Sequence, residues 1–295
     1  MRVLGLGDNI IDRFIDRQVD YPGGNAVNVA VFARRHGAES AYLGVFGDDE
    51  LAGFLRGCLE AEGVDTSRSQ VKHGATGISR LHVVDSERVF LGWNGGGVTV
   101  SDPLELDAEL LAYVSGFDLA HSSVYSGIES QLAALRKTDT LVSFDFSSES
   151  EYRSADYLAR VAPAVDLALV SCGELPPEQA DELLRSIHAA GAPLVLGTCG
   201  TAGSRLFDGT QILTHPAHLH QDLTQLRDTM GCGDAALAGF ATSLLADGWS
   251  RRQRPTLEAL RRGLERAAEA AKVQCTVEAA FAHPRSWRDE TLPVR

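Results

Sequence analysis

The chain has 295 residues, 44% of them hydrophobic, and 40 acidic residues against 27 lysines and arginines give it a net charge of -13. This excess of negative charge argues against nucleic acid and anionic membranes as partners. The mean hydropathy of -0.07 and the lack of a long apolar run or signal segment indicate a water-soluble globular protein. Five cysteines, an odd number without a C-x-x-C pair, are typical of small core residues in a reducing compartment. We therefore expect a cytoplasmic protein.

The N-terminal segment is a short apolar strand at residues 2–7 that ends in Gly-x-Gly. This pattern suggests a dinucleotide site, but the third glycine would fall at Ile10 and no helix signal follows. An NAD-dependent oxidoreductase is therefore a weak alternative. The next residues, 7–12 (GDNIID), indicate a polar turn in which Asn9 and Asp12 either hold a ligand or face solvent.

Residues 22–30 (PGGNAVNVA) lead into a helix that ends at Gly37, followed by a strand at 40–45 and a helix that ends near residue 61. Two glycines let the backbone approach a ligand closely, and two asparagines are suited both to capping the helix and to binding hydroxyl groups. The candidate ligand-binding residues of this segment are Gly23, Gly24, Asn25 and Asn28.

Two strand-like runs, at residues 78–84 and 88–93, flank a predicted hairpin turn at 85–87. Residues 14–19 are expected to form a further strand. Two aromatic residues of the second run, Phe90 and Trp93, are expected to face a substrate, a partner or solvent.

From about residue 100 onward, strands at 118–121, 141–146, 167–171 and 194–198 alternate with helices. That alternation predicts βαβ units and a parallel sheet with helices on both faces. Asp145 follows one of these strands, at the edge where α/β proteins place ligands. A last long helix is expected from about residue 256 to 273, before an irregular tail.

The sequence DTMGCGD at residues 228–234 precedes apolar residues at helical spacing, so that Gly231, Cys232 and Gly233 open a helix. Free backbone N–H groups and the positive end of the helix dipole make such a place an anion hole, best suited to phosphate. The carboxylate of Asp234 beside it is suited to taking a proton from an attacking hydroxyl. This stretch alone equally allows an Asp that only favours the helix dipole.

Two further segments are candidate nucleotide and metal sites. Residues 197–203 (GTCGTAG) end a strand with glycines that would let phosphates reach backbone amides. Glu174 follows another strand and is either a magnesium ligand or the start of a helix. A trio of histidines is a weaker candidate for a zinc site, with a surface segment as the preferred interpretation. These histidines are His215, His218 and His220.

Taken in order, these motifs resemble the PfkB, or ribokinase-like, family of sugar kinases over nearly the whole chain. DTMGCGD resembles the pattern D-T-x-G-A-G-D and departs from it at Cys232, which keeps its backbone N–H; Ser171 stands where many members have Asn before Glu174. The resemblance implies one ribokinase-like domain over residues 1–295. Its fold would be a three-layer α/β sandwich with a small β lid formed by about residues 12–22 and 71–98, through which members often dimerise.

The resemblance also implies ATP and Mg²⁺ as cofactors, a catalytic base at Asp234 and an anion hole at Gly231, Cys232 and Gly233. Sugar contacts would come from Asn9, Asp12, Gly23, Gly24, Asn25, Asn28, Phe90 and Asn94. Nucleotide contacts would come from Thr198, Gly200, Gly203 and Ala268, with Ala267 and Ala271 beside the adenine. Glu174 would hold the magnesium through water.

Within the family, GDNIID, GGNAVNVAV, KHG followed by ATG, FDFS and DTMG resemble the branch that phosphorylates fructosamines such as fructoselysine. That branch implies transfer of a phosphoryl group to a primary hydroxyl, with the substrate's tail leaving near Arg88, Phe90 or Asn94. The alternative within the family is a ribokinase- or fructokinase-like enzyme acting on a free sugar. A sugar- or nucleotide-binding protein without catalysis is disfavoured, because it has no use for a base at Asp234.

Overall fold

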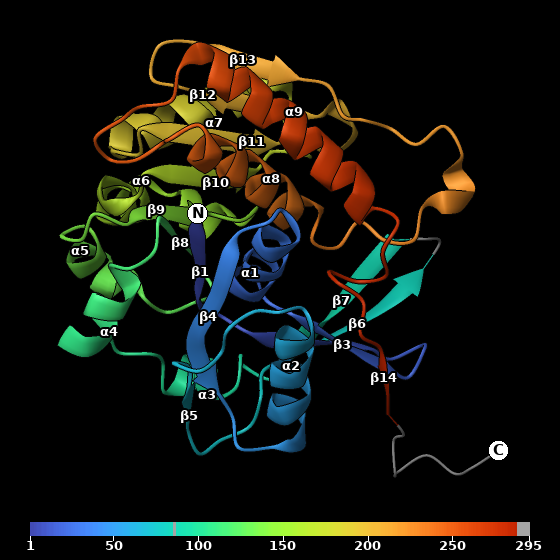
Figure 1. Cartoon of the computed structure of the whole chain (residues 1–295). Helices are drawn as coiled ribbons and strands as arrows, with labels where there is room; N and C mark the ends of the chain where they lie inside the picture. Colours follow the sequence, from blue (N-terminus) through green and yellow to red (C-terminus); the bar gives the residue numbers. More distant parts are fainter. Residues whose placement is uncertain (85–86, 288–295) are drawn as a thin grey trace.

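The protein is described by a computed structural model covering residues 1–84 and 87–287, so Asp85 and Ser86 of the predicted hairpin turn lie outside the described residues. The large sheet has nine strands in the order β13-β12-β11-β10-β9-β8-β1-β4-β5 (Figure 1). Its strands are β1 (Arg2–Gly7), β4 (Glu39–Phe46), β5 (Gln70–Val71), β8 (Leu119–Ser123), β9 (Leu141–Asp145), β10 (Leu167–Ser171), β11 (Leu194–Thr198), β12 (Ser204–Phe207) and β13 (Ile212–His215).

Strands β5, β4, β1, β8, β9, β10 and β11 pair in parallel with their neighbours, which confirms the predicted parallel sheet. The antiparallel strands β12 and β13, which the sequence did not predict, extend its edge. After Gly7 the chain enters another strand rather than a helix, so the dinucleotide interpretation was wrong. Because the parallel strands share one direction, the ends of β1, β9, β10 and β11 meet at one edge of the sheet.

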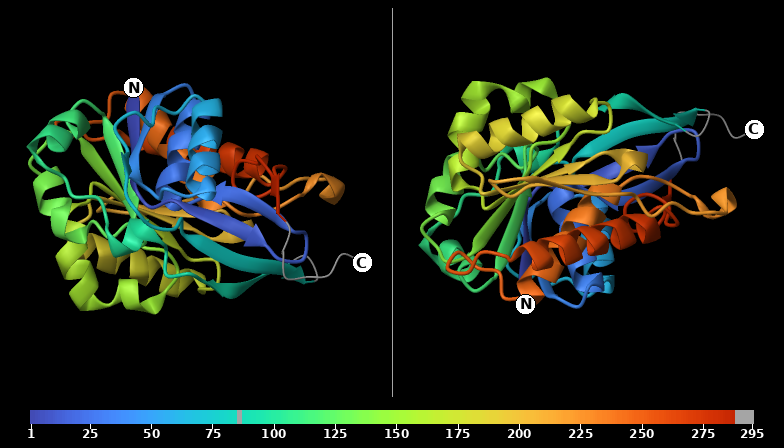
Figure 2. Two further views of the ribbon diagram at one scale, coloured as in Figure 1. Left: turned by 90° about the horizontal axis from the view of Figure 1, so that it is seen from below. Right: turned by 90° about the horizontal axis from the view of Figure 1, so that it is seen from above.

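Helices cover both faces of this sheet (Figures 1 and 2). Alternate residues of each strand enter different cores, as Val3 joins one core while Leu4 and Leu6 join the other. On one face lie α1 (Asn25–Arg35), α2 (Glu50–Ala61), α8 (Cys232–Ala246) and α9 (Leu257–Gln274). On the other lie α4 (Ala108–Val114), α5 (Leu132–Leu135), α6 (Ala155–Val161) and α7 (Pro177–Ala190), and the short α3 (Val98–Ser101) follows the small sheet in the chain.

The small sheet has five strands in the order β14-β3-β2-β6-β7 and projects from the body of the molecule (Figure 2). These strands are β2 (Ile10–Phe14), β3 (Val19–Gly23), β6 (Ile78–Val84), β7 (Glu87–Trp93) and β14 (Arg285–Ser286). The expected strand at 14–19 was misplaced, because residues 15–18 form the turn between β2 and β3. Residue 71, the first residue of the predicted lid segment 71–98, lies in β5, which pairs with β4 of the large sheet and not with the small sheet. The C-terminal tail, expected to be irregular, adds strand β14 to the small sheet.

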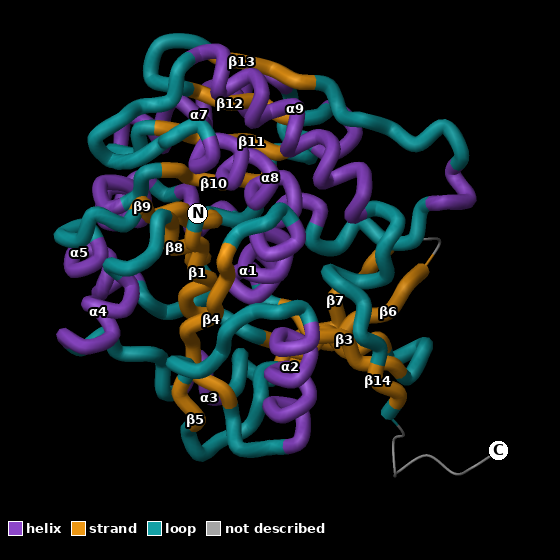
Figure 3. Tube along the Cα trace, in the orientation of Figure 1, coloured by secondary structure: helices purple, strands orange, loops and turns teal. Residues whose placement is uncertain are grey.

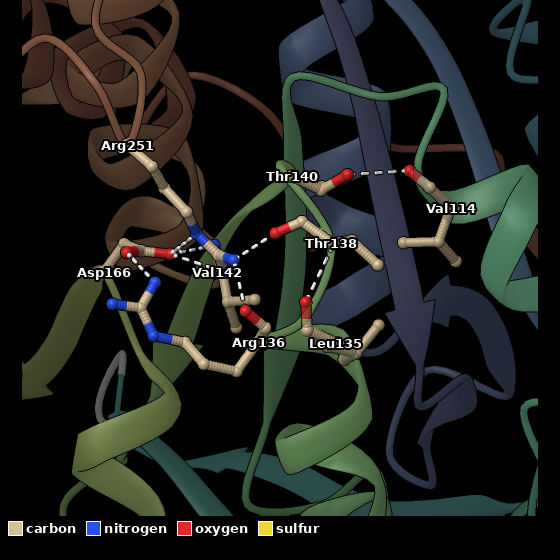
Figure 4. A network of polar contacts seen from close by, with 8 residues as sticks. All are labelled: Val114, Leu135, Arg136, Thr138, Thr140, Val142, Asp166 and Arg251. Carbon is tan, nitrogen blue, oxygen red and sulfur yellow. Dashed lines mark hydrogen bonds and ion pairs between the residues drawn. The ribbon is translucent and has the colours of Figure 1, made fainter.

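A polar network surrounds Asp166 at the amino-terminal end of β10, at the opposite end of the strand from the carboxyl ends described above (Figure 4). This buried carboxylate accepts hydrogen bonds from the Val142 N–H at 2.9 Å, from Arg136 at 3.1 Å and from Arg251 at 3.1 Å. Arg251 also donates to the carbonyls of Arg136 and Thr138. The network links the start of β10 to neighbouring loops. Its ion pairs therefore lie away from the carboxyl ends of β9 and β10.

The connection from β13 to α8 is a long loop, residues 216–231, that contains only a short 3₁₀ turn (Figure 3). Its last residues carry the DTMG motif, which is thereby brought to the carboxyl edge of the large sheet. Within the described ranges 1–84 and 87–287, we find no helix with the length and hydropathy needed to cross a membrane.

Candidate active site

The N-terminus of α8 is built around a left-handed glycine. Gly231 is the residue before the helix, with φ of 74°, and a Cβ there would lie 3.2 Å from the Cα of Ala280. The Cys232 N–H donates a long hydrogen bond of 3.3 Å to the Thr229 carbonyl. Across the described part of the chain, no acceptor is found for the N–H groups of Gly231 and Gly233. These two amides are therefore the more available donors of the expected anion hole.

Asp234 lies in the first turn of α8, and only 8% of its surface is exposed. Burial, followed by the charge of nearby Asp145, raises the pKa of the Asp234 carboxyl well above its usual value. Its Oδ2 accepts a hydrogen bond of 2.8 Å from the side-chain amide of Asn28. The other end of that amide, Oδ1, is buried and has no hydrogen-bond partner in the part of the chain that the structure describes. A buried acceptor next to a buried base is suited to a hydroxyl-bearing ligand.

The start of α1 is arranged differently from the expectation that Asn25 and Asn28 cap the helix. Gly24 is the capping residue, with φ of 114° and no side-chain cap. The buried carboxylate of Asp8 accepts from the Ala26 N–H at 3.3 Å instead, and both asparagines point to carboxylates. Asn25 donates to Asp145 at 2.6 Å, so the asparagines hold the acids of the site.

Asp8 is a functional residue that sequence reasoning missed. Its Oδ1 also accepts from the hydroxyls of Ser123 at 2.9 Å and Ser126 at 2.7 Å, and burial raises the pKa of its carboxyl. The available signal was an acidic residue directly after a Gly-x-Gly strand end. Asp8 anchors the loop after β8 to the start of α1.

Asp12 lies on strand β2 and not in the expected turn. A Cβ at Gly23 would lie 2.3 Å from its Oδ2, so that glycine provides the room for this carboxylate. Burial raises the pKa of Asp12 to about 7, although the charge of Arg88 opposes the shift. Arg88 itself lies 3.5 Å from Asp228 and donates to Thr229 at 3.0 Å, which joins the small sheet to the DTMG motif.

A cavity of about 700 Å³, named the sugar cavity after the ligand that the sequence predicts for its lining, contains most of the expected sugar-binding residues. Two of the expected residues do not line it: Gly23, which lies against the Asp12 carboxylate, and Asn94. Asn94 instead holds the small sheet, accepting from the Ile78 N–H and donating to the Thr76 carbonyl. The side-chain nitrogen of Asn9 donates hydrogen bonds to the Tyr42 hydroxyl and the Val45 carbonyl. The predicted residues that line the cavity are Asn9, Asp12, Gly24, Asn25, Asn28, Phe90, Trp93, Gly231 and Asp234.

A second cavity, of about 300 Å³ and hereafter the nucleotide cavity, lies across the start of α8. Gly203 adjoins it, where a Cβ would lie 2.1 Å from the His215 carbonyl oxygen. Its wall includes Cys232 and Gly233, whereas Gly231 and Asp234 face the sugar cavity. The two cavities therefore meet at the helix N-terminus. Lining residues expected from the sequence are Thr198, Gly200, Gly203, Ala267, Ala268 and Ala271.

Two cysteines of the nucleotide cavity lie together. The Sγ atoms of Cys232 and Cys275 are 3.2 Å apart, and both thiols are free. A hydrogen bond from the Cys232 thiol, with a smaller contribution from the charge of His220, lowers the pKa of Cys275 to about 7 against the effect of burial. The same pairing raises the pKa of Cys232. The expectation that the cysteines are only core residues was wrong for this pair.

The candidate metal ligands differ in their surroundings. Glu174 is exposed in the turn after β10 and lines neither cavity. Among the described residues, Glu174 belongs to no cluster of potential metal ligands, so the structure places no second ligand beside it. Of the three histidines, His215 and His218 lie 2.7 and 3.4 Å from Glu265, while His220 points to the Lys272 carbonyl. The three histidines therefore do not form the predicted cluster, because His215 and His218 gather around Glu265 without His220.

Residues 15–280 match the model of the pfkB family of carbohydrate kinases. The chain is 35% identical over 291 residues to a fructosamine kinase of Bacillus subtilis (strain 168), covering 98% of this chain and 96% of that protein. It is 32% identical over 249 residues to fructoselysine 6-kinase of Escherichia coli (strain K12), covering 83% and 88%.

Among solved structures, a fructokinase with bound ATP from Xylella fastidiosa superposes with a TM-score of 0.77. The superposition covers 95% of this chain and 94% of that one, at 19% sequence identity. At that identity the likeness concerns the fold, and it agrees with a layered α/β body that carries a small sheet.

Proposed function

Because this chain belongs to the PfkB family of carbohydrate kinases and is a phosphotransferase that acts on a sugar, we propose that it phosphorylates a primary hydroxyl of a fructosamine such as fructoselysine, with ATP as donor. The observation that carries the proposal is the position of Asp234. This buried carboxylate stands at the one helix N-terminus that both cavities share, where a hydroxyl in the first can meet a phosphoryl group in the second.

Asp234 acts as the general base in this proposal. Burial and the neighbouring Asp145 raise the pKa of Asp234, which strengthens it as a proton acceptor from an alcohol. The hydrogen bond from Asn28 fixes which oxygen faces the substrate. The N–H groups of Gly231 and Gly233, with a weaker part for Cys232, stabilise the negative charge of the transferred group.

Magnesium, when bound with ATP, neutralises phosphate charge and aligns the transferred group. Glu174 would hold it through water. On the nucleotide side, Thr198, Gly200 and Gly203 are placed to receive phosphates and ribose, and the alanines of α9 to receive the base. Because the side chains of these alanines are small, they leave the slot open for a flat ring.

The sugar ring would bind through Asp12, Asn25 and Asn28, with Gly24 giving close approach of the backbone. Asp12 receives room from Gly23, and the unpaired Oδ1 of Asn28 would accept from a sugar hydroxyl. Phe90 and Trp93 of the small sheet would close over the ring. Asn94 is left out of this proposal, because both ends of its amide are already bound to backbone.

The choice of a fructosamine rests on the names of two relatives above 30% identity, a fructosamine kinase and a fructoselysine 6-kinase. A free-sugar kinase is the second candidate within the family. We expect kcat/KM to be higher for fructoselysine than for fructose or ribose, because a site built for an amine leaves polar groups unpaired with a plain sugar. If ribose or fructose is better by tenfold, roughly 1.4 kcal/mol of transition-state binding, the substrate assignment is wrong while the kinase remains.

We also propose that the small sheet forms a homodimer. Strand β7 lies at the edge of that sheet, and its Val89, Phe90, Leu91 and Trp93 are 40 to 63% exposed. An open edge with apolar side chains is suited to pairing with another copy. Sedimentation at micromolar concentration should show a dimer, and Leu91→Asp should shift it to monomer. A wild-type protein that sediments as a monomer would contradict this proposal.

A further inference from the structure

One wall of the sugar cavity has no role in the mechanism above. It is made by Tyr125, which follows β8, and by Glu149, Glu151 and Tyr152, which follow β9. We call these four residues the tyrosine–glutamate wall. The Tyr125 hydroxyl donates to Glu149 Oε1 at 2.6 Å, and the rings of Tyr125 and Tyr152 meet edge to face at 6.3 Å. The wall thus places carboxylates and aromatic rings side by side.

Glu149 is exposed at the cavity and favours its charged form. Partial burial raises the pKa of Glu149, but hydrogen bonds from Ser147 and Tyr125 outweigh this effect and lower it. Ser147 takes the left-handed φ of 57° that turns the loop there. Its N–H donates to Asp145 at 2.7 Å, so the wall is built directly onto the acids of the site.

The sugar cavity has no positive charge to neutralise this wall. Asp8, Asp12, Asp234, Glu149 and Glu151 line it, and none of its described lining residues is Lys, Arg or His. Two arginines lie close to the cavity without lining it: Arg88 is 3.5 Å from Asp228, and Arg153 donates to the Ser147 carbonyl at 2.8 Å. A neutral sugar ring needs hydroxyl partners, which Asp12 and the asparagines supply, but it does not need two more carboxylates.

The cavity also requires a ligand that donates hydrogen bonds. The Oδ1 of Asn28, in a side chain only 6% exposed, is buried where the cavity meets Asp234, and no hydrogen-bond partner for it is found within residues 1–84 and 87–287. Leaving such an acceptor unpaired is costly, so a donor belongs there. Together with the anionic wall, this acceptor favours a ligand with hydroxyl donors at one end and a positive charge at another.

We propose that the tyrosine–glutamate wall binds the protonated secondary amine attached to C1 of the sugar, and so selects glycated amines over free sugars. This inference rests on the proposed function and deepens it. Carboxylates supply the opposite charge, and aromatic rings attract an ammonium through their π faces. The substrate's tail would therefore leave past Tyr125 and Tyr152, and not near Arg88, Phe90 or Asn94 as the sequence suggested.

The test compares two substrates that differ in one atom. One is a fructosamine with an alkylamino group at C1, and the other is the matching 1-O-alkyl ether, which has no charge. In the double variant Glu149→Gln/Glu151→Gln, we expect KM for the amine to rise roughly tenfold or more, with kcat little changed. KM for the ether should stay within about twofold, because neither glutamate faces a charge in that complex.

A matched control is available in Glu129→Gln. Glu129 accepts a hydrogen bond of 2.8 Å from the Tyr157 hydroxyl, a similar tyrosine–glutamate pair that does not line the cavity. This variant should change neither KM. Its melting temperature, compared with that of the double variant, separates a loss of fold from a loss of binding.

The outcomes separate the two proposals. If the wild type phosphorylates the amine but the double variant affects both substrates equally, or neither, this inference is overturned and the proposed function stands. If the wild type phosphorylates the ether or free fructose and not the amine, the proposed substrate is wrong, and the wall has no amine to bind. A selective rise of KM for the amine alone supports both.

Discussion

The Asp234→Asn variant is expected to bind ATP as the wild type does and to lose turnover by about 10²- to 10⁴-fold, the usual contribution of a general base. The amide keeps the shape of the side chain and its place beside Asn28, which lies 2.8 Å away. It cannot accept the proton of the attacking hydroxyl. Single-turnover measurements with saturating ATP and sugar report this step, and nucleotide affinity is measured separately by calorimetry.

The pH dependence of kcat provides a second readout for the same base. Because burial raises the pKa of Asp234, the carboxylate is protonated, and so inactive, at higher pH than an ordinary Asp. Wild-type kcat should therefore fall as the pH is lowered through that raised pKa, whereas the residual kcat of Asp234→Asn should not follow this group. A variant with near-wild-type turnover would remove Asp234 from the mechanism.

A matched control lies at the other end of the same helix. Asp247 follows α8, accepts from Arg262 at 2.9 Å and lines neither the sugar nor the nucleotide cavity. Asp247→Asn should leave kcat and its pH profile unchanged. If both variants lost activity equally, the cause would be damage to α8 and not removal of a base.

Features encoded in a continuous stretch of sequence could be predicted. The helical spacing after Asp234 and the glycines before it predict the start of α8, and the alternation of strands and helices predicts the parallel sheet. The residue Asp8 was missed although it adjoins Asn9. Its role depends on Ser123 and Ser126, more than a hundred residues away, and no local pattern reports such a contact.

The same reason explains the other corrections. Asparagine is a common helix-capping residue, but Asn25 and Asn28 donate to carboxylates of β9 and α8. These long-range contacts override the local capping preference. Strand β14 has only two residues, so its pairing with β3 leaves no periodic signal. The tyrosine–glutamate wall joins two loops that the sequence separates by more than twenty residues.

Alkylation of Cys275 is expected to abolish activity. Its thiol is held near a pKa of about 7 by the hydrogen bond from Cys232, against burial, so a large share is thiolate at neutral pH. An added alkyl group would occupy the nucleotide cavity beside Ala271 and Cys232. Incubation with iodoacetamide should therefore remove nearly all turnover, and ATP should slow the loss because it fills the same space.

Peptide mass spectrometry identifies which thiol carries the label. Cys199 is the competing site, because a hydrogen bond from Cys172 lowers its pKa to about 7 as well, but it does not line the cavity. Cys275→Ser should stay active and resist inactivation, whereas Cys199→Ser should be inactivated as fast as the wild type. ATP should protect position 275 and not position 199. If Cys275→Ser is inactivated at the wild-type rate, the sensitive thiol lies elsewhere, and alkylation of Cys275 is not the cause of the lost activity.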